Sequence, residues 1–135
     1  MGLPPTRLDG VHVLVVDDNA DALEIMQAFL THGGAVVTTA RNGAEALGAL
    51  REIKAHVIVS DLSMPGLDGY EFLERVRALP GEAQHPTPAI AVSAFNTREH
   101  RSEALRRGFR LFMPKPIDPA TLADAVSRLA SGETP

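Results

Sequence analysis

The chain has 135 residues, enough for one domain with a hydrophobic core but too few for two domains of ordinary size. Its net charge of -4 excludes binding to nucleic acid by bulk electrostatic attraction, which requires a basic surface. Cysteine is absent, which excludes disulfides and thiolate metal ligands, and no apolar stretch approaches the ~20 residues of a membrane span. We therefore expect a cytoplasmic protein whose partners include neither nucleic acid nor a membrane.

The domain organisation is simple, because no repeat, low-complexity tract or interdomain linker interrupts the sequence. Residues 1–9 and 131–135 have the character of loose chain ends, so a flexible N-terminal segment and a flexible C-terminal tail are expected there. The folded domain is then expected to span residues 10–130.

Five apolar runs predict five β-strands, near residues 11–16, 35–39, 56–60, 88–93 and 110–113. Most are unbroken stretches of Val, Ile, Leu and Ala, which favours strands that are covered on both faces. The run at 35–39 is the most polar, and we expect it at an edge of the sheet. Segments with helical periodicity separate the runs, so the pattern is typical of an α/β fold with crossover helices.

Four of the intervening segments carry apolar residues at helical spacing, which predicts amphipathic helices. The spaced residues are Ala22, Ile25, Met26, Phe29 and Leu30; Ala46, Leu47, Leu50 and Ile53; Phe72, Leu73, Val76 and Leu79; and Leu122, Ala125, Val126 and Leu129.

Capping residues indicate where helices begin. Asn42, Asp68 and Asn96 each precede a glutamate by three residues, which is the spacing of a capping box. Asp118 precedes Pro119, and proline suits the first position of a helix.

The segment 97–108 is the weakest predicted helix. Its only sizeable apolar side chain is Leu105, helped by Ala104, and most of the other residues are charged. Because little burial means low local stability, we expect this element to move most readily. The Pro- and Gly-containing stretch 79–88 is expected to be a surface loop.

Polar residues stand at the ends of four apolar runs, namely Asp17, Asp18, Asp61, Ser93 and Lys115. In an open α/β sheet, ligand sites form beyond the carboxyl ends of the strands. Each residue alone is better explained by a structural role, such as a helix cap, a turn acid or a surface lysine. Their coincidence at four strand ends favours one common site.

Three carboxylates in one pocket imply a cation. Two carboxylates about 4 Å apart repel by roughly 4 kcal/mol at an effective dielectric constant of about 20. A divalent cation removes this repulsion, and oxygen ligands without His or Cys favour Mg²⁺. A carboxylate that is already ionised can attack a phosphoryl group without a general base. The cluster therefore predicts Mg²⁺-dependent phosphoryl transfer.

The motifs at these positions resemble those of the receiver domains of two-component response regulators. They are Val-Val-Asp17-Asp18, Val-Ser-Asp61-Leu-Ser-Met-Pro65-Gly-Leu-Asp-Gly69, Val-Ser93-Ala94 and Lys115-Pro116. Family members usually have a cis peptide bond in the last of these motifs, so one is expected here. The resemblance covers about residues 11–130 and implies a flavodoxin-like, doubly wound, five-stranded parallel sheet of order 2-1-3-4-5 with five helices. The chain would be a stand-alone regulator or the receiver of a hybrid histidine kinase.

The resemblance also implies roles for the site residues. Asp61 would accept the phosphoryl group, and Asp17, Asp18 and the backbone carbonyl of Ser63 would join it in binding Mg²⁺. Lys115 would pair with the phosphate or with Asp61. The donor would be a phosphohistidine on a histidine kinase or a histidine phosphotransfer protein, and a downstream protein target would read the result.

A conformational switch is implied as well. Ser93, where receivers commonly have Thr, would bond a phosphoryl oxygen and move inward. Phe112 would fill the vacated space, and the segment 97–108 would shift. Because Phe lacks the hydroxyl of Tyr, this switch would rest on packing. Ser63 and Phe95 occupy positions that influence the lifetime of the phosphoryl group in this family.

Three other functions are possible for this sequence. A degenerate receiver would act as a phosphorylation-independent interaction module, although an incomplete acidic set would be expected for it. An Asp-nucleophile Mg²⁺ phosphatase would need an Asp-x-Asp motif, whereas the chain reads Asp61-Leu62-Ser63. A flavodoxin-like cofactor binder would need a Ser/Thr/Gly-rich phosphate loop where Asp17 and Asp18 stand. We therefore favour a signalling switch over a metabolic enzyme.

Overall fold

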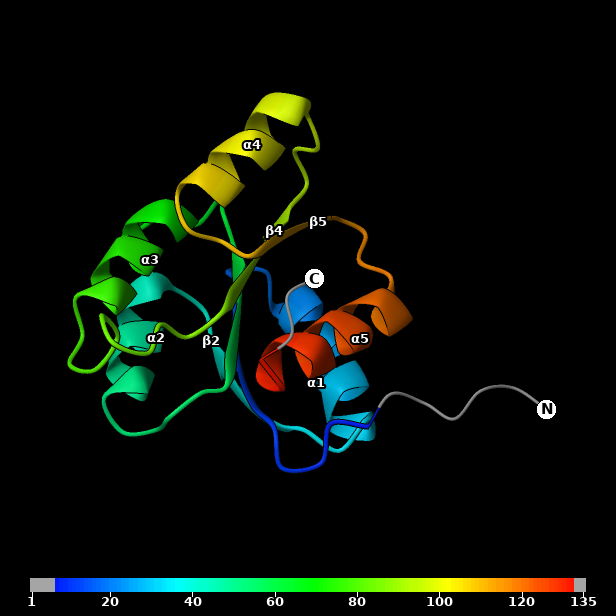
Figure 1. Cartoon of the computed structure of the whole chain (residues 1–135). Helices are drawn as coiled ribbons and strands as arrows, with labels where there is room; N and C mark the ends of the chain where they lie inside the picture. The colour runs from blue at the N-terminus through cyan, green and yellow to red at the C-terminus, as the bar shows by residue number, and fades with distance from the viewer. Residues whose placement is uncertain (1–6, 133–135) are drawn as a thin grey trace.

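The computed structural model describes residues 7–132, which form a parallel β-sheet with helices on both faces (Figure 1). The elements in chain order are β1 (His12–Val16), α1 (Ala20–His32), β2 (Val36–Ala40), α2 (Gly43–Leu50), β3 (Val57–Asp61), α3 (Gly69–Arg77), β4 (Ala89–Ser93), α4 (Arg98–Arg106), β5 (Leu111–Pro114) and α5 (Pro119–Ala130). The predicted fold class is confirmed, because the strands are parallel and their order is β2-β1-β3-β4-β5.

The two faces of the sheet carry separate cores. Helices α1 and α5 lie together on one face, and α2, α3 and α4 lie on the other (Figure 1). Every residue of β3 and β4 is buried, which explains why their sequences are unbroken apolar runs. The more polar β2 lies at an edge, as its composition predicts. Across residues 7–132, no helix combines the length and the apolar character needed to cross a membrane.

Three of the four predicted helix caps are present. Asn42 Oδ1 accepts a hydrogen bond from the amide of Glu45, and Asp118 caps α5. Asp68 and Glu71 form a reciprocal capping box, in which each side chain accepts from the backbone amide of the other. These helix starts follow from local chemistry, so the sequence was sufficient to locate them.

The predicted cap at Asn96 is wrong, because Thr97 caps α4 instead. Thr97 Oγ1 accepts a hydrogen bond from the amide of His100 at 3.1 Å. The side-chain oxygen of Asn96 instead accepts from Arg101 Nη2 at 2.8 Å. Both Asn and Thr can cap a helix, so the cap is decided by the residue at which the helical backbone begins, and α4 begins at Arg98.

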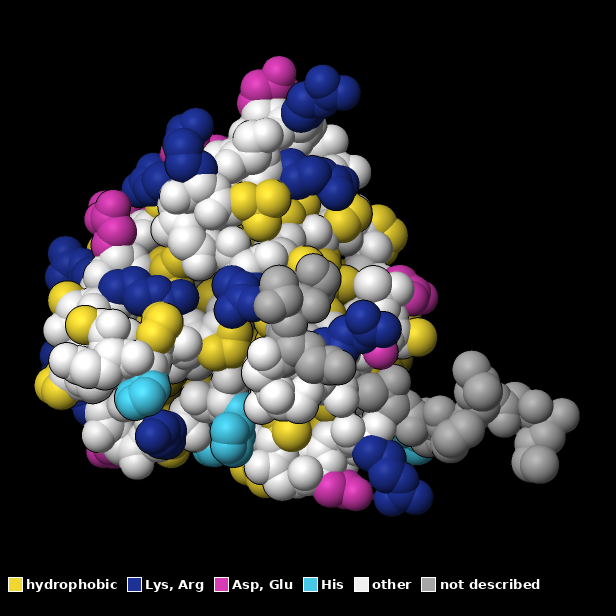
Figure 2. Space-filling view, viewed as in Figure 1, with side chains coloured by type: hydrophobic (Ala, Val, Ile, Leu, Met, Phe, Trp, Pro, Cys, Tyr) yellow, Lys and Arg dark blue, Asp and Glu magenta, His cyan; other side chains and the backbone are white. Residues whose placement is uncertain are grey.

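Helix α4 is weakly attached to the domain, but Leu105 is not its anchor. Ala104 is the fully buried residue of this helix, whereas the Leu105 side chain is 49% exposed. The expectation that Leu105 is the main buried side chain of α4 is therefore wrong. The expectation that α4 buries few of its side chains is confirmed. Arginine and glutamate side chains cover the outer surface of α4 (Figure 2).

The apolar stripe predicted on α1 is only partly buried. Met26 and Leu30 lie in the core, but Ile25 and Phe29 are 53% and 38% exposed. Leu23, which the predicted stripe omitted, is buried in their place. The covered face of α1 is thus rotated relative to the predicted stripe.

Leu8 belongs to the packed domain, although the sequence places it in the loose N-terminal segment. Its side chain is fully buried, and its amide donates to the carbonyl of Gly33 at 2.7 Å. The flexible segment was expected over residues 1–9, and residues 1–6 of it lie outside the described residues. Of the expected C-terminal tail, residues 133–135 also lie outside them.

The loop between α3 and β4 is held by a polar network that the sequence did not reveal. The Glu82 carboxylate accepts hydrogen bonds from Arg77 Nη1 at 2.8 Å, from Thr87 Oγ1 at 2.6 Å and from the Thr87 amide at 3.1 Å. Arg77 Nη1 also donates to the Thr87 carbonyl at 2.8 Å. This loop is therefore tied to the end of α3.

Candidate functional site

The sheet topology brings the polar strand ends to one edge. Asp17 follows β1 directly, and Asp61 and Ser93 are the last residues of β3 and β4. Lys115 follows β5, and its amide donates to the Ser93 carbonyl at 2.8 Å. Since β1, β3, β4 and β5 are successive neighbours in the sheet, these residues lie side by side at its carboxyl edge.

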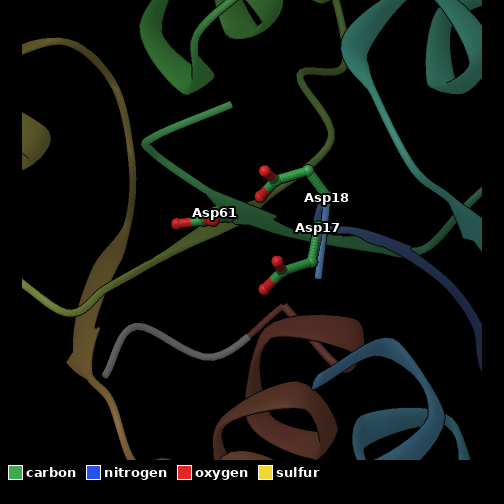
Figure 3. A group of neighbouring side chains, drawn as sticks. All are labelled: Asp17, Asp18 and Asp61. Atoms are coloured by element: carbon green, nitrogen blue, oxygen red, sulfur yellow. The ribbon is translucent and has the colours of Figure 1, made fainter. Parts of the chain in front are cut away.

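Three carboxylates converge at this edge. Asp17, Asp18 and Asp61 each offer an oxygen atom within 4.8 Å of the other two. Figure 3 shows their side chains projecting to the same side from the ends of β1 and β3. Asp17 is fully buried and Asp61 nearly so, whereas Asp18 is exposed. Carboxylate oxygens gathered in this way could hold a hard divalent cation.

Lys115 supplies positive charge to the cluster. Its Nζ atom donates a hydrogen bond to Asp17 Oδ2 at 2.8 Å and lies 3.6 Å from Asp61 Oδ2. The other oxygen of Asp17 accepts from the amide of Asn19 at 2.9 Å. The shorter contact of Lys115 is therefore with Asp17, whereas the family resemblance implied pairing with the phosphate or with Asp61.

The electrostatic environment raises the pKa of Asp61 to about 6 from its ordinary value of 3.8. Burial is the main cause, and the negative charge of Asp17 adds to it. The charge of Lys115 and a hydrogen bond from the Ser63 amide, at 3.3 Å, oppose the rise. The site therefore contains a carboxylate whose ionised form is costly until more positive charge is present.

The pKa of Lys115 is raised as well. Burial alone would lower this pKa, but the hydrogen bond to Asp17 and the charge of Asp61 outweigh burial. Lys115 thus stays cationic at neutral pH.

Ser93 lies in the wall of an adjoining cavity. Its side chain is buried, and its Oγ atom accepts a hydrogen bond from the amide of Phe95 at 3.0 Å. The cavity has a volume of about 680 Å³, and Ser63, Ser93, Phe95 and His100 are among its lining residues. A hydroxyl therefore faces the space next to the acidic cluster.

A family model described as the response regulator receiver domain matches residues 13–127. The chain belongs to this family. An uncharacterized 14.6 kDa protein of Leptolyngbya boryana is 43% identical to the receiver over 117 residues, which cover 86% of this chain and 87% of that protein. Histidine kinases are also among the relatives, and the receiver spans between 13% and 20% of their length.

Solved structures of receivers have the same fold. The receiver domain of the Francisella response regulator 1452 is 31% identical, with a TM-score of 0.82 over 91% of this chain and 98% of that chain. The Saccharomyces cerevisiae complex of the histidine phosphotransfer protein Ypd1 with the Ssk1 receiver domain matches with 25% identity and a TM-score of 0.83, over 95% of this chain and 94% of that chain.

The loop after β3 in this receiver depends on a glycine. A Cβ atom on Gly69 would stand 2.6 Å from the Asp61 carbonyl oxygen and 2.8 Å from Leu62 Cα. The amide of Gly69 also donates to the Leu62 carbonyl at 2.9 Å. Only glycine allows the start of α3 to approach the strand end so closely. The loop that carries Ser63 is thus held against the site.

Two further expectations concern the Lys115–Pro116 peptide bond and Phe112. The peptide bond between Lys115 and Pro116 is cis, as expected. Phe112 is buried on β5, with the Arg101 guanidinium 5.4 Å from its ring centroid. The predicted switch residue is therefore covered by a side chain of α4.

His100 and Tyr70 lie beside the site, although no sequence pattern predicts a role for them there. His100 stacks on Phe95, with ring centroids 5.6 Å apart and an angle of 20° between the rings. Tyr70 lines the same cavity, and its hydroxyl is buried without a hydrogen-bond partner among the described residues. Neither residue lies at the end of a strand or in one of the motifs, so the local sequence does not indicate a role for it.

Proposed function

We propose that this receiver takes a phosphoryl group from a phosphohistidine onto Asp61 in a Mg²⁺-dependent reaction, later hydrolyses it, and switches its output face in response. The observation that carries the proposal is the convergence of Asp17, Asp18 and Asp61 beside the Lys115 ammonium at the sheet edge. No part of the acidic set is missing, which argues against a phosphorylation-independent module.

The residues present fit a magnesium ion. The donors are carboxylate oxygens, and mutual repulsion among them contributes to the raised pKa of Asp61. Asp17, Asp18 and Asp61 would hold the ion, with the backbone carbonyl of Ser63 as a further ligand. When bound, Mg²⁺ would neutralise charge on the oxygens of the phosphoryl group.

Asp61 is the nucleophile in this reaction. One of its carboxylate oxygens attacks the phosphorus atom, forming an oxygen–phosphorus bond while the bond from phosphorus to the donor imidazole breaks. The bonding electron pair leaves with the imidazole nitrogen. With a pKa of about 6, Asp61 is mostly ionised at neutral pH, so no general base is required.

Lys115 and Ser93 bind the transferred group. Lys115 Nζ lies 3.6 Å from Asp61, close enough to pair with a phosphoryl oxygen on that residue. The Ser93 hydroxyl accepts from the Phe95 amide and keeps its own hydrogen to donate. Both groups stand beside the acceptor before the phosphoryl group arrives, which reduces the reorganisation required.

The switch runs from Ser93 through Phe112 to α4. Ser93 is drawn toward the phosphoryl group, Phe112 moves into the vacated space, and α4 shifts because it buries so little. The test is amide hydrogen exchange across residues 93–113 with and without the phosphoryl group. Identical exchange in the two states would rule the switch out.

The proposed phosphodonor is a histidine kinase or a histidine phosphotransfer protein, in the cytoplasm. The support is the similarity to histidine kinases and to the receiver in the Ypd1 complex. The proposed recipient of the signal is a downstream protein that contacts the face containing α4.

Intact-mass spectrometry tests the proposed chemistry directly. The receiver, incubated with Mg²⁺ and a small phosphodonor such as acetyl phosphate, should gain one phosphoryl group. Asp61→Asn should gain none, and Asp124→Asn, which changes an exposed acid on α5, should behave like the parent. Absence of an adduct on the parent, under conditions in which other receivers react, would refute the proposed function.

A further inference from the structure

We infer that His100 is a positioning residue of the receiver, which holds the Phe95 ring beside the cavity that Ser63 and Ser93 line and so slows hydrolysis of the phosphoryl group. The inference rests on the proposed function, because it concerns the aspartyl phosphate on Asp61. The stack of the two rings beside the cavity that Ser63 and Ser93 line is the observation that carries it.

Phe95 is an exposed aromatic residue whose backbone is fixed to the site. Its amide donates to Ser93 Oγ at 3.0 Å, yet 57% of the residue remains accessible to solvent. Across residues 7–132, His100 is the one aromatic ring that pairs with it. The backbone of Phe95 is therefore anchored, and its ring stacks on the ring of His100.

His100 is itself held by the first turn of α4. Thr97 Oγ1 accepts from the His100 amide at 3.1 Å and lies 2.5 Å from His100 Nδ1. A hydroxyl can accept from the amide and donate its hydrogen to the ring nitrogen at the same time. The imidazole is thus restrained by the helix cap on one side and by the Phe95 ring on the other.

The position of the Phe95 ring matters because hydrolysis needs water at the phosphorus atom. A water oxygen attacks phosphorus, the bond from phosphorus to the Asp61 oxygen breaks, and the products are the free carboxylate and inorganic phosphate. An aromatic ring in the wall of the cavity hinders the approach of water from that side. When the stack is removed, the ring is free to turn into solvent, and the water has a wider route.

The expected effect is modest. His100→Ala should speed the loss of the phosphoryl group by roughly two- to tenfold, the factor that corresponds to one aromatic pair. His100→Phe keeps a ring for stacking and should restore slow loss. Glu99→Ala, a change of the neighbouring exposed residue on the same turn, should leave the rate unchanged.

The rate is measured as decay of the phosphorylated intact mass after the donor is removed. If His100 acts through Phe95, then His100→Ala should have no further effect in a Phe95→Ala background. Alanine suits an exposed helical position, so the variant should fold. As a direct check on the stack, the ring-proton NMR shifts of Phe95 should change in His100→Ala and stay in place in Glu99→Ala.

The outcomes separate this inference from the proposed function. If the parent forms no adduct, the proposed function fails. If the parent and the variants all form adducts on Asp61 but decay at the same rate, the role of His100 fails while the proposed function stands. An equal acceleration by His100→Ala with and without the Phe95 ring would also overturn the inference.

Discussion

The Nζ atom of Lys115 lies 2.8 Å from Oδ2 of Asp17, and this hydrogen bond joins residues 98 positions apart in the chain. Asp17 is fully buried, so its charge needs a partner inside the protein. The same ammonium is 3.6 Å from Asp61. In the metal-free receiver, Lys115 is therefore the cation that balances two buried carboxylates.

Removal of that cation should destabilise the metal-free protein. Lys115→Met removes the cation that pairs with Asp17 and Asp61, and we expect the free energy of unfolding to fall by about 1–3 kcal/mol. Bound Mg²⁺ should reduce the loss, because it supplies charge to the same carboxylates. Urea unfolding with and without Mg²⁺ measures both effects. Lys54→Met, at an exposed position, is the control, and an equal loss in the two variants would contradict the argument.

The raised pKa of Asp61 should make its effect on stability depend on pH. The pKa is 3.8 in an ordinary setting and about 6 in the fold, so the folded protein holds this proton more tightly than the unfolded chain does. The contribution of Asp61 to stability is therefore fully present below about pH 4, and is lost as the pH rises to about 6.

Asp61→Asn removes that pH-dependent loss. Relative to the parent, the metal-free variant should gain roughly 2–3 kcal/mol in the free energy of unfolding at about pH 7.5 and little at about pH 4. Urea titrations at the two pH values provide the measurement. Asp124→Asn should show no such difference, and a gain for Asp61→Asn that is equal at both pH values would disprove the assignment to ionisation.

The contact between Arg101 and Phe112 should restrain α4. Arg101→Ala uncovers the Phe112 ring, so amide exchange across Arg98–Arg106 should accelerate while global stability changes by less than about 1 kcal/mol. Arg101→Lys keeps the charge but loses the planar group that stacks on a ring, and should give an intermediate result. Arg98→Ala serves as the control. Unchanged exchange in Arg101→Ala would show that the contact restrains nothing.

The network around Glu82 should matter for stability but not for phosphoryl transfer. Glu82→Ala removes the acceptor of three hydrogen bonds from Arg77 and Thr87, and we expect a loss of about 2 kcal/mol in the free energy of unfolding. The loop precedes β4, away from the carboxyl edge of the sheet, so adduct formation on Asp61 should persist. Glu52→Ala, at an exposed position, should be nearly neutral, and a matching loss there would weaken the assignment.

Much of the fold could be predicted because its signals are local or nearly so. Unbroken apolar runs mark strands that are covered on both faces, and the caps at Asn42, Asp68 and Asp118 each need only three following residues to form. The placement of the site residues followed from the same reasoning. Once the strands are parallel, Asp17, Asp61 and the other strand ends must share an edge.

The remaining features depend on contacts between distant segments. Helical spacing defines a stripe on α1, but the packing of neighbouring elements decides that Leu23 is covered and Ile25 and Phe29 are not. Likewise, the sequence offers two acids to Lys115, and only the folded geometry gives the short contact to Asp17. The stack of His100 on Phe95 joins residues only five positions apart, but it depends on the exact start of α4, which the sequence placed at Asn96 instead of Thr97.

Helix α4 fully buries Ala104 alone among its residues, which separates two kinds of sequence constraint in this receiver. Residues at the strand ends are fixed by chemistry, whereas the outer face of α4 is free to vary at little cost to the core. If α4 is the output face, as proposed above, recognition of a downstream protein can diverge by substitutions on α4 while the strand-end residues stay unchanged. On that proposal, a designer could change the output by substituting the outer face of α4 while keeping Ala104, His100 and Arg101, which contact the rest of the domain.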